Sequence, residues 1–381
     1  LRVNLPVAPV YDIIVKDDDL VAATHGRSFW IMDDLTQLRQ LTGDVSSQAV
    51  RLLKPGLTHR LGPTGGRGMP SSVKSYQLGL GAVATSTEST DDTGQTTRKF
   101  LDAGQNPPGG VRVHYWLADE PEGEITLSFL DKDGGEIKTF TSAKPDKDAD
   151  DGPAEPRLTK SSGLNRFDWN TRYADAHKVS GDKTTAGALI GPKAPPGSYS
   201  VGLTVGDQAQ TEQFDLVKDP RVAASQEDLD AQFAMLLTLR DKLSEAHDNI
   251  NRLRSVKHQV TEWSKRAAGG TAAESIASVA ETLNKKLSDI EAILIQTEYK
   301  GARDRLTLPV RLNGKLAGLI PVVAVGDYAP PAQTRDVFQV YSERLDAQFQ
   351  ALEKVIDEDM AQFDNLVHEL EVPAIVPRAS E

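Results

Sequence analysis

The chain has 381 residues, 39% of them hydrophobic and 26% charged, so it is long enough to bury two or three hydrophobic cores. Its net charge of −12 argues against a nucleic-acid-binding protein, because such proteins neutralise phosphates with lysine and arginine. The absence of cysteine excludes disulfides, thiolate nucleophiles and cysteine-ligated zinc. No apolar run approaches the roughly 20 residues of a membrane-spanning helix, so no membrane span is predicted.

The first expected elements are two short strands, residues 20–23 and 28–31, which are rich in β-forming side chains. Gly26 provides the turn between them, and the apolar run 11–15 precedes them. An isolated two-stranded hairpin is marginally stable in water, so this one needs a partner. Residue 1 is Leu rather than Met, which leads us to expect a piece of a longer protein.

The polar residues of this hairpin are the first candidates for a binding site. His25, Arg27 and Trp30 are the residues that we consider for a ligand or a partner. The alternative, which we favour, is structural. In that reading Thr24 and His25 satisfy the backbone of the turn, Arg27 pairs with a carboxylate, and Trp30 packs between sheets.

Asp33 and Asp34 form an adjacent acidic pair, and glycosidases use two carboxyl groups. Nothing in the flanking sequence indicates an apolar pocket that would raise the pKa of one of them. We therefore expect one of the two to cap a short helical turn at residues 35–40.

Residues 43–70 are rich in Gly and Pro and read as a linker, with one strand-like run at 49–53. From residue 71 to 218 the hydrophobic period is two, which predicts an antiparallel β-sandwich of immunoglobulin-like type. The expected strands are residues 111–117, 124–130, 136–140, 164–169, 198–205 and 210–217.

Two insertions interrupt these strands. Residues 144–156 are acidic and predict a solvated loop, while residues 175–196 are rich in Gly, Lys and Pro and predict a surface excursion. Within the first, the run that begins at Asp146 fails as an EF-hand loop, because position 6 is Asp151 rather than Gly and position 12 is Arg157 rather than Glu.

After residue 220 the period becomes helical, which predicts an elongated antiparallel helical bundle. Ser225 and Asp228 predict a capping box at the start of the first long helix. The expected helices are residues 225–268, 271–294, 312–319 and 333–370.

No catalytic, cofactor-binding or metal-binding residue is predicted from motifs. His247 and His258 are not at the spacing of a zinc-binding pair, and the chain contains no nucleophile elbow, Walker sequence or dinucleotide fingerprint. We expect no cofactor.

Four stretches together resemble the C-terminal region of large sortilin-like or Asp-box (BNR-repeat) β-propeller proteins, including glycosidase-like members. They are the Thr-His-Gly-Arg-Ser-Phe-Trp-Ile phrase at residues 24–31, the Gly-Leu-Asn-Arg-Phe-Asp-Trp run at 163–169, the Pro-Gly-Ser-Tyr run at 196–199, and residues 231–252. The resemblance implies a multidomain β and α chain, divided into a terminal hairpin of a propeller (1–42), a linker (43–70), an immunoglobulin-like sandwich (71–218), a helical bundle (221–370) and a tail (371–381).

From this resemblance we expect a non-catalytic accessory region of an exported protein that is periplasmic, on the cell surface or secreted. Its expected partners are the propeller domain of the same parent chain and a protein partner or second copy bound through the bundle. One alternative is a carbohydrate-interaction module with Tyr115 and Trp116 on an exposed face. A second is part of a hydrolase site completed by missing blades, so whether the parent is an enzyme stays open.

Overall fold

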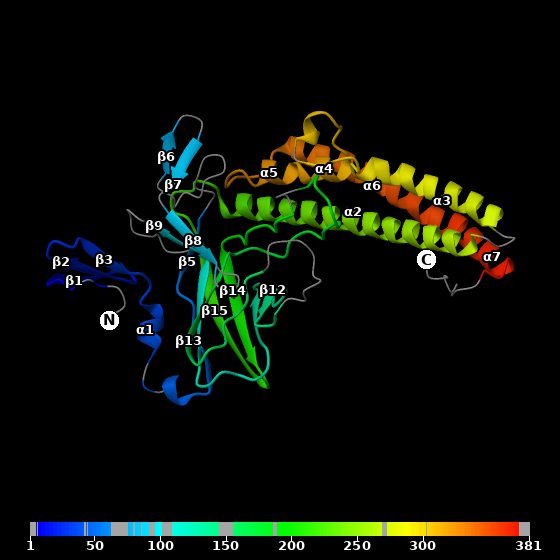
Figure 1. Cartoon of the computed structure of the whole chain (residues 1–381). Helices are drawn as coiled ribbons and strands as arrows, with labels where there is room; N and C mark the ends of the chain where they lie inside the picture. The colour runs from blue at the N-terminus through cyan, green and yellow to red at the C-terminus, as the bar shows by residue number, and fades with distance from the viewer. Residues whose placement is uncertain are drawn as a thin grey trace. The chain divides into compact units, whose positions relative to one another are not determined.

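The computed structural model describes residues 5, 7–41, 43, 45–61, 75–78, 81–84, 86–90, 96–100, 109–144, 155–185, 189–268, 273–301 and 303–372. The chain combines β-sheets with helices and divides into two compact units (Figure 1). The β unit comprises residues 1–173 and 193–223, and the helical unit comprises residues 174–192 and 224–381. The polypeptide therefore passes between the units three times, at Tyr173, Pro192 and Ala223.

A three-stranded antiparallel sheet opens the chain, in the order β1-β2-β3. Its strands are β1 (Val10–Lys16), β2 (Asp19–Thr24) and β3 (Phe29–Met32). The predicted hairpin is confirmed, and the apolar run that precedes it supplies the third strand. Gly26 has φ +69°, a left-handed conformation that glycine adopts without strain.

Two larger sheets share one core. One has the order β13-β10-β4 and the other β12-β11-β14-β15-β5. The strands are β4 (Val50–Leu52), β5 (Thr58–Arg60), β10 (Val111–Leu117), β11 (Ile125–Leu130), β12 (Glu136–Thr141), β13 (Gly163–Trp169), β14 (Gly197–Val205) and β15 (Gln208–Lys218).

The expectation of a purely antiparallel sandwich is wrong at one edge, where β5 pairs with β15 in parallel. β5 lies in the segment 43–70, which was predicted to be a linker, because a run of three residues is too short to show a hydrophobic period. In the same stretch are α1 (Thr36–Gln40) and the 3₁₀ turn η1 (Val45–Ser47). Two hairpins, β6 (Ser75–Leu78) with β7 (Gly81–Ala84) and β8 (Ser86–Thr90) with β9 (Thr96–Phe100), also belong to the β unit.

Aromatic rings fill the core between the two sheets. Trp169 is fully buried and stacks on Phe129, with ring centroids 4.3 Å apart and planes 20° apart. Trp169 is thus a central side chain of this core. Gly110 lies against the same strand, and a Cβ there would meet the carbonyl oxygen of Trp169 at 2.1 Å, so no larger residue fits without movement.

The helical unit is formed by α2 (Gln226–Ala267), α3 (Ala273–Leu294), η2 (Asp304–Leu306), α4 (Leu312–Ala317), α5 (Leu319–Val323), α6 (Ala332–Lys354), the π-helical turn η3 (Val355–Met360) and α7 (Ala361–Glu369). The Ser225 hydroxyl accepts a hydrogen bond from the Asp228 amide, and the Asp228 carboxylate accepts one from the Ser225 amide. The predicted capping box is therefore confirmed.

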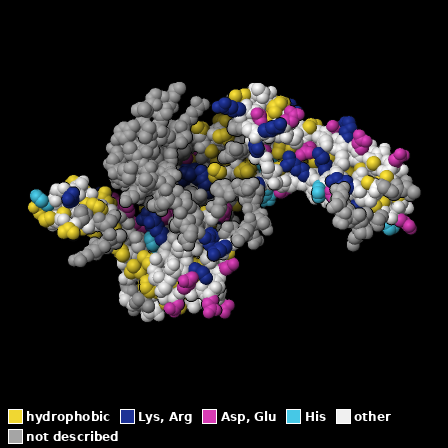
Figure 2. All heavy atoms as spheres, viewed as in Figure 1, with side chains coloured by type: hydrophobic (Ala, Val, Ile, Leu, Met, Phe, Trp, Pro, Cys, Tyr) yellow, Lys and Arg dark blue, Asp and Glu magenta, His cyan; other side chains and the backbone are white. Residues whose placement is uncertain are grey.

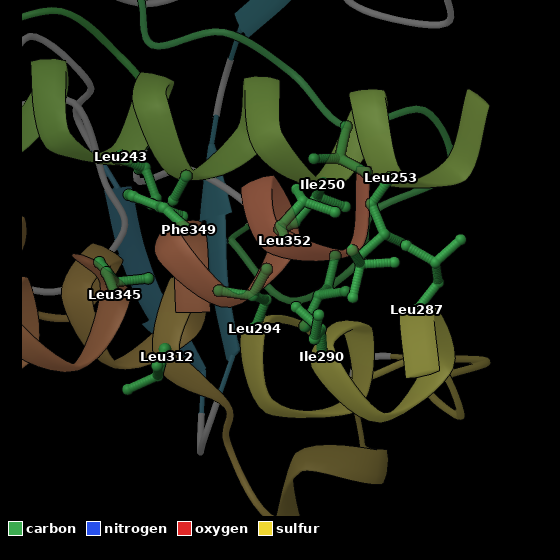
Figure 3. Close-up of a cluster of buried hydrophobic side chains, with 14 of the residues drawn as sticks. Leu243, Ile250, Leu253, Leu287, Ile290, Leu294, Leu312, Leu345, Phe349 and Leu352 are labelled. Atoms are coloured by element: carbon green, nitrogen blue, oxygen red, sulfur yellow. The ribbon is translucent and has the colours of Figure 1, made fainter. Parts of the chain in front are cut away.

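The helices of this unit supply one hydrophobic core, and Figure 3 shows a part of it. Side chains from α2, α3, α4 and α6 meet there, labelled Leu243, Ile250, Leu253, Leu287, Ile290, Leu294, Leu312, Leu345, Phe349 and Leu352. The apolar positions of the helical repeat are thus the buried ones, as the period of the sequence predicts. Residues 269–272, most of the 144–156 insertion and most of the 371–381 tail lie outside the described residues.

The second insertion is not a surface excursion, and this expectation is wrong. Residues 174–192 belong to the helical unit, where Ala176 and Val179 are buried in its core. The segment from Ala174 to Ser180 lies along α2, and polar side chains on one stripe of that helix bind its backbone carbonyls. The stripe consists of Arg240, His247, Asn251 and Arg254.

The distances in this array are those of ordinary hydrogen bonds. Donation to the carbonyls of residues 174, 177, 178 and 180 occurs at 3.0, 2.6, 2.8 and 3.2 Å, respectively. From Ala174 to Ser180 an extended chain spans about 20 Å, at about 3.3 Å per residue. From Arg240 to Arg254 a helix spans about 21 Å, at about 1.5 Å per residue. The two lengths are similar, so donors spread along this part of the helix match carbonyls spread along the segment.

We expect the change Val179→Ser to lower the unfolding free energy of the helical unit by about 2 kcal/mol, because it removes buried methyl groups and buries a hydroxyl. The measurement is chemical denaturation followed by the helical circular dichroism signal. Val337→Ser on the exposed side of α6 is the control and should cost about 0.5 kcal/mol or less. Equal effects of the two variants would show that residues 174–192 do not pack into the core.

His114 on β10 makes the β unit sensitive to acid. Burial, and then repulsion from Arg112 and Arg166, lowers its pKa from 6.5 to about 4. The folded chain therefore resists taking up a proton that the unfolded chain binds below pH 6.5. Stability falls as the pH drops from 6.5 to about 4 and levels off below that value.

We expect His114→Gln to remove roughly 2–3 kcal/mol of this pH-dependent loss of unfolding free energy. Denaturation followed by tryptophan fluorescence at a series of pH values between 7 and 4 measures it, with the exposed His59→Gln as the control. An unchanged pH slope in His114→Gln would contradict the assignment.

Candidate functional site

The three residues singled out from the sequence lie at one end of the β1–β3 sheet. His25 and Arg27 are exposed in the turn that joins β2 to β3, and Trp30 is half-buried on β3. The Trp30 indole Nε1 donates a hydrogen bond to the Arg27 carbonyl at 2.9 Å. The Thr24 hydroxyl donates to the Ser28 carbonyl at 2.6 Å, so Thr24 satisfies the turn backbone as expected.

The side chains of His25 and Arg27 do not make the contacts that we expected from the structural interpretation of the hairpin. The His25 ring lies against Tyr11, with centroids 5.1 Å apart, rather than on the turn backbone. Within the part of the chain that the structure describes, Arg27 forms no ion pair.

The more informative feature of this sheet is its apolar surface. Tyr11 and Phe29 are each 71% exposed, and Ile31 is 59% exposed. The register places Ile14 and Ile31 with Val21 on one face, and Ile13 with Ala22 and Trp30 on the other. Exposed apolar side chains therefore lie on both faces. In Figure 2 the hydrophobic colour gathers over these strands, at the left of the view.

The edges of the sheet are also open. Its order is β1-β2-β3, so β1 and β3 each have one side without a paired strand in the described structure. An exposed apolar edge strand is a template for pairing with another strand. A sheet with two apolar faces and open edges is expected to bind other β structure.

Neither residue of the acidic pair is the N-cap of α1, because that position is Leu35, which makes no side-chain capping bond. The Asp34 Oδ1 instead accepts a local hydrogen bond from the Thr36 amide at 3.1 Å. Its other carboxylate oxygen lies 3.8 Å from the Arg112 guanidinium. Burial, and then repulsion from Asp19, raises the pKa of Asp33. Asp34 thus has partners at the exit from the sheet, whereas the surroundings of Asp33 disfavour its charged form.

Tyr115 and Trp116, the aromatic pair considered for a carbohydrate-binding surface, do not lie on the same face of the sheet. Tyr115 is fully buried, and its hydroxyl donates to the Thr159 carbonyl; burial raises its pKa to about 12. Trp116 is half-buried on the opposite face of β10. Because neighbours in a strand point to opposite faces, the two rings do not form a common plane.

The two histidines of α2 do not form a metal site. His247 is buried, and its Nδ1 donates to the His177 carbonyl; burial lowers its pKa. His177 itself binds both oxygens of Asp248 at 2.9 Å. Among the described residues, no group of three or more His, Asp or Glu side chains could hold a metal ion.

A cleft of about 410 Å³ lies in the helical unit between α3, α4 and α6. Its apolar lining consists of Ile293, Pro309, Val310, Leu312 and Ala347. Its polar lining consists of Arg311, Lys315, Arg344 and Gln348. This volume is within the range of about 300–1,000 Å³ that is typical of small-molecule sites.

The charge of this cleft is opposite to that of the whole chain. Its lining includes three cationic side chains and no carboxylate, whereas the chain carries a net charge of −12. The Arg311 Nε is buried and has no hydrogen-bond partner. Leaving such a donor unpaired costs about 1–3 kcal/mol, so the position is a stability defect in the unliganded chain.

This cleft was not predicted from the sequence. Arg311 and Lys315 are four residues apart at the start of a short helix, a spacing that places both on one face. That spacing was the available signal. Arg344 lies 29 residues after Lys315, on another helix. Nothing in the hydrophobic period of the sequence indicates that Arg344 lines the same cleft as the other two cations.

No protein-family model and no curated protein matches the chain. A solved structure titled "pT26-6p" aligns with 68% of this chain at 10% identity and a TM-score of 0.14. The alignment spans 46% of that structure's chain. A TM-score this low supports no conclusion about fold or function. Within the described residues, no helix combines the length and the apolar composition that crossing a membrane requires.

We expect Arg311→Met to raise the unfolding free energy of the unliganded helical unit by about 1 kcal/mol, because it removes an unpaired buried donor and keeps an apolar stem. Thermal or chemical denaturation measures the change. Arg335→Met, at an exposed position of α6 outside the cleft, should alter stability by about 0.5 kcal/mol or less. A clear loss of stability in Arg311→Met would mean that this arginine supports the fold.

Proposed function

We propose that this chain is a non-catalytic docking and assembly region of an exported β-propeller protein, and that the β1–β3 sheet is its docking element. The observation that supports this most directly is the exposure of large apolar side chains on both faces of that sheet. The occupant that we propose is the propeller of the parent chain. The exported location rests on the resemblance of residues 24–31 and 163–199 to propeller proteins.

A propeller blade is the kind of sheet that needs both faces covered. Blades are typically four-stranded sheets arranged around a channel, and each packs between two neighbours. The β1–β3 sheet has three strands and an open edge on each side. One further strand at an edge would give it the number of strands of a blade.

The energetics favour a bound state of this sheet. A fully buried aliphatic or aromatic side chain contributes about 1.5–3 kcal/mol relative to an exposed one. Ile13, Ile14, Val15, Phe29 and Ile31 are each more than half exposed. Monomeric proteins rarely expose apolar patches of this kind without a binding role.

The test uses this chain together with the propeller region of its parent reading frame, expressed as a separate polypeptide. We expect a complex on size-exclusion chromatography with light scattering. Ile14→Ser with Ile31→Ser alters one face, and Ile13→Ser with Val15→Ser alters the other. Because a blade is packed on both faces, each pair should weaken the complex by about tenfold or more.

The matched control is Val322→Ser with Val325→Ser, two exposed valines of the helical unit, which should leave the affinity unchanged. Loss of binding from only one face would favour an ordinary one-sided interface over a blade. Absence of any complex would contradict the proposal.

A further inference from the structure

We propose that the cleft between α3, α4 and α6 is a binding site for an organic carboxylate with an apolar body. This cleft lies wholly in the helical unit and is independent of the β1–β3 sheet. Its lining combines apolar side chains with three cations, the two kinds of contact that such a ligand needs.

The cationic side determines the charge of the ligand. Among the described residues Arg311, Lys315 and Arg344 form no ion pair, although the chain carries a net charge of −12. A guanidinium binds a carboxylate through two parallel hydrogen bonds. Arg311 is half-buried, so its interaction with an anion is screened less by solvent than those of the exposed Lys315 and Arg344.

The buried Nε of Arg311 is the second observation that points to a ligand. It has no acceptor, and the residue lines the cleft. A carboxylate in the cleft would supply the missing acceptor and a counter-charge at the same time. A neutral ligand would supply at most the acceptor, and a cationic ligand would not supply the counter-charge.

The apolar side determines the body of the ligand. Ile293 and Val310 are 43% and 39% exposed, and they lie on the same cleft as the three cations. Inorganic phosphate or sulfate would bind the cations and leave these side chains in water. An aliphatic chain attached to the carboxylate would cover them.

The experiment is isothermal titration calorimetry of the full chain with octanoate. Octan-1-ol has the same chain without the charge, and inorganic phosphate has charge without the chain. We expect octanoate to bind and both comparison ligands to bind at least about tenfold more weakly. An acetylated Ala-Val-Leu tripeptide with a free carboxylate, against its amide, distinguishes the C-terminus of a peptide from a free acid as the source of the carboxylate.

Arg311→Gln and, separately, Arg344→Gln should each weaken octanoate binding by about fivefold or more, with the larger loss at Arg311. Arg344 is exposed, so its variant should fold even if the Arg311 variant does not. Arg335→Gln on the same helix removes an equal charge outside the cleft and should leave the affinity unchanged. Equal loss in Arg335→Gln, equally tight phosphate binding, or no octanoate binding would each overturn the proposal.

Discussion

The helical unit depends on hydrogen bonds between one stripe of α2 and the backbone of a segment that belongs, by sequence, to the β region. Arg240, His247, Asn251 and Arg254 donate to carbonyls between Ala174 and Ser180. Three of these bonds are exposed to solvent and the one from His247 is part-buried, so they hold the segment along the surface of the helix. The segment then contributes Ala176 and Val179 to the core of the helices.

The same stripe connects this segment to the opposite helix. Arg254 donates through Nη1 to Ser180 and through Nε to Glu291 on α3, at 3.2 and 2.8 Å. Lys257 binds the other oxygen of Glu291 at 2.8 Å. These bonds lower the pKa of Glu291 although burial alone would raise it. A nearly buried carboxylate is thus kept charged by partners on the neighbouring helix.

Much of the secondary structure was predictable because its signals are local. The capping box at Ser225 and Asp228 and the alternation of β10 each depend on residues that are close in sequence. The position of residues 174–192 was not predictable in this way. The donors on α2 have the same spacing as an ordinary solvated polar face, and the segment contributes mainly its backbone, which has no sequence signature.

The candidate sites likewise have some features that are local in sequence and others that depend on packing between distant segments. His25, Arg27 and Trp30 were correctly placed on a hairpin, but the functional interest of that sheet lies in its exposed apolar residues, which in sequence look like any strand core. The cleft needs Arg344 beside Arg311, and that proximity comes from packing of α6 against α4. Pairing between distant helices is determined by the whole core, so a single sequence does not show it.

The way in which α2 holds residues 174–180 also has an evolutionary consequence. The helix binds main-chain oxygens, which every amino acid possesses, so most side chains of the segment are free to drift. The donors are more constrained, because a substitution at Asn251 or Arg254 would replace a hydrogen bond to the segment with one to water. Selection on this contact should therefore conserve the donor residues of the helix, which in sequence resemble any solvent-exposed polar face. It should conserve few side chains of the segment that they bind.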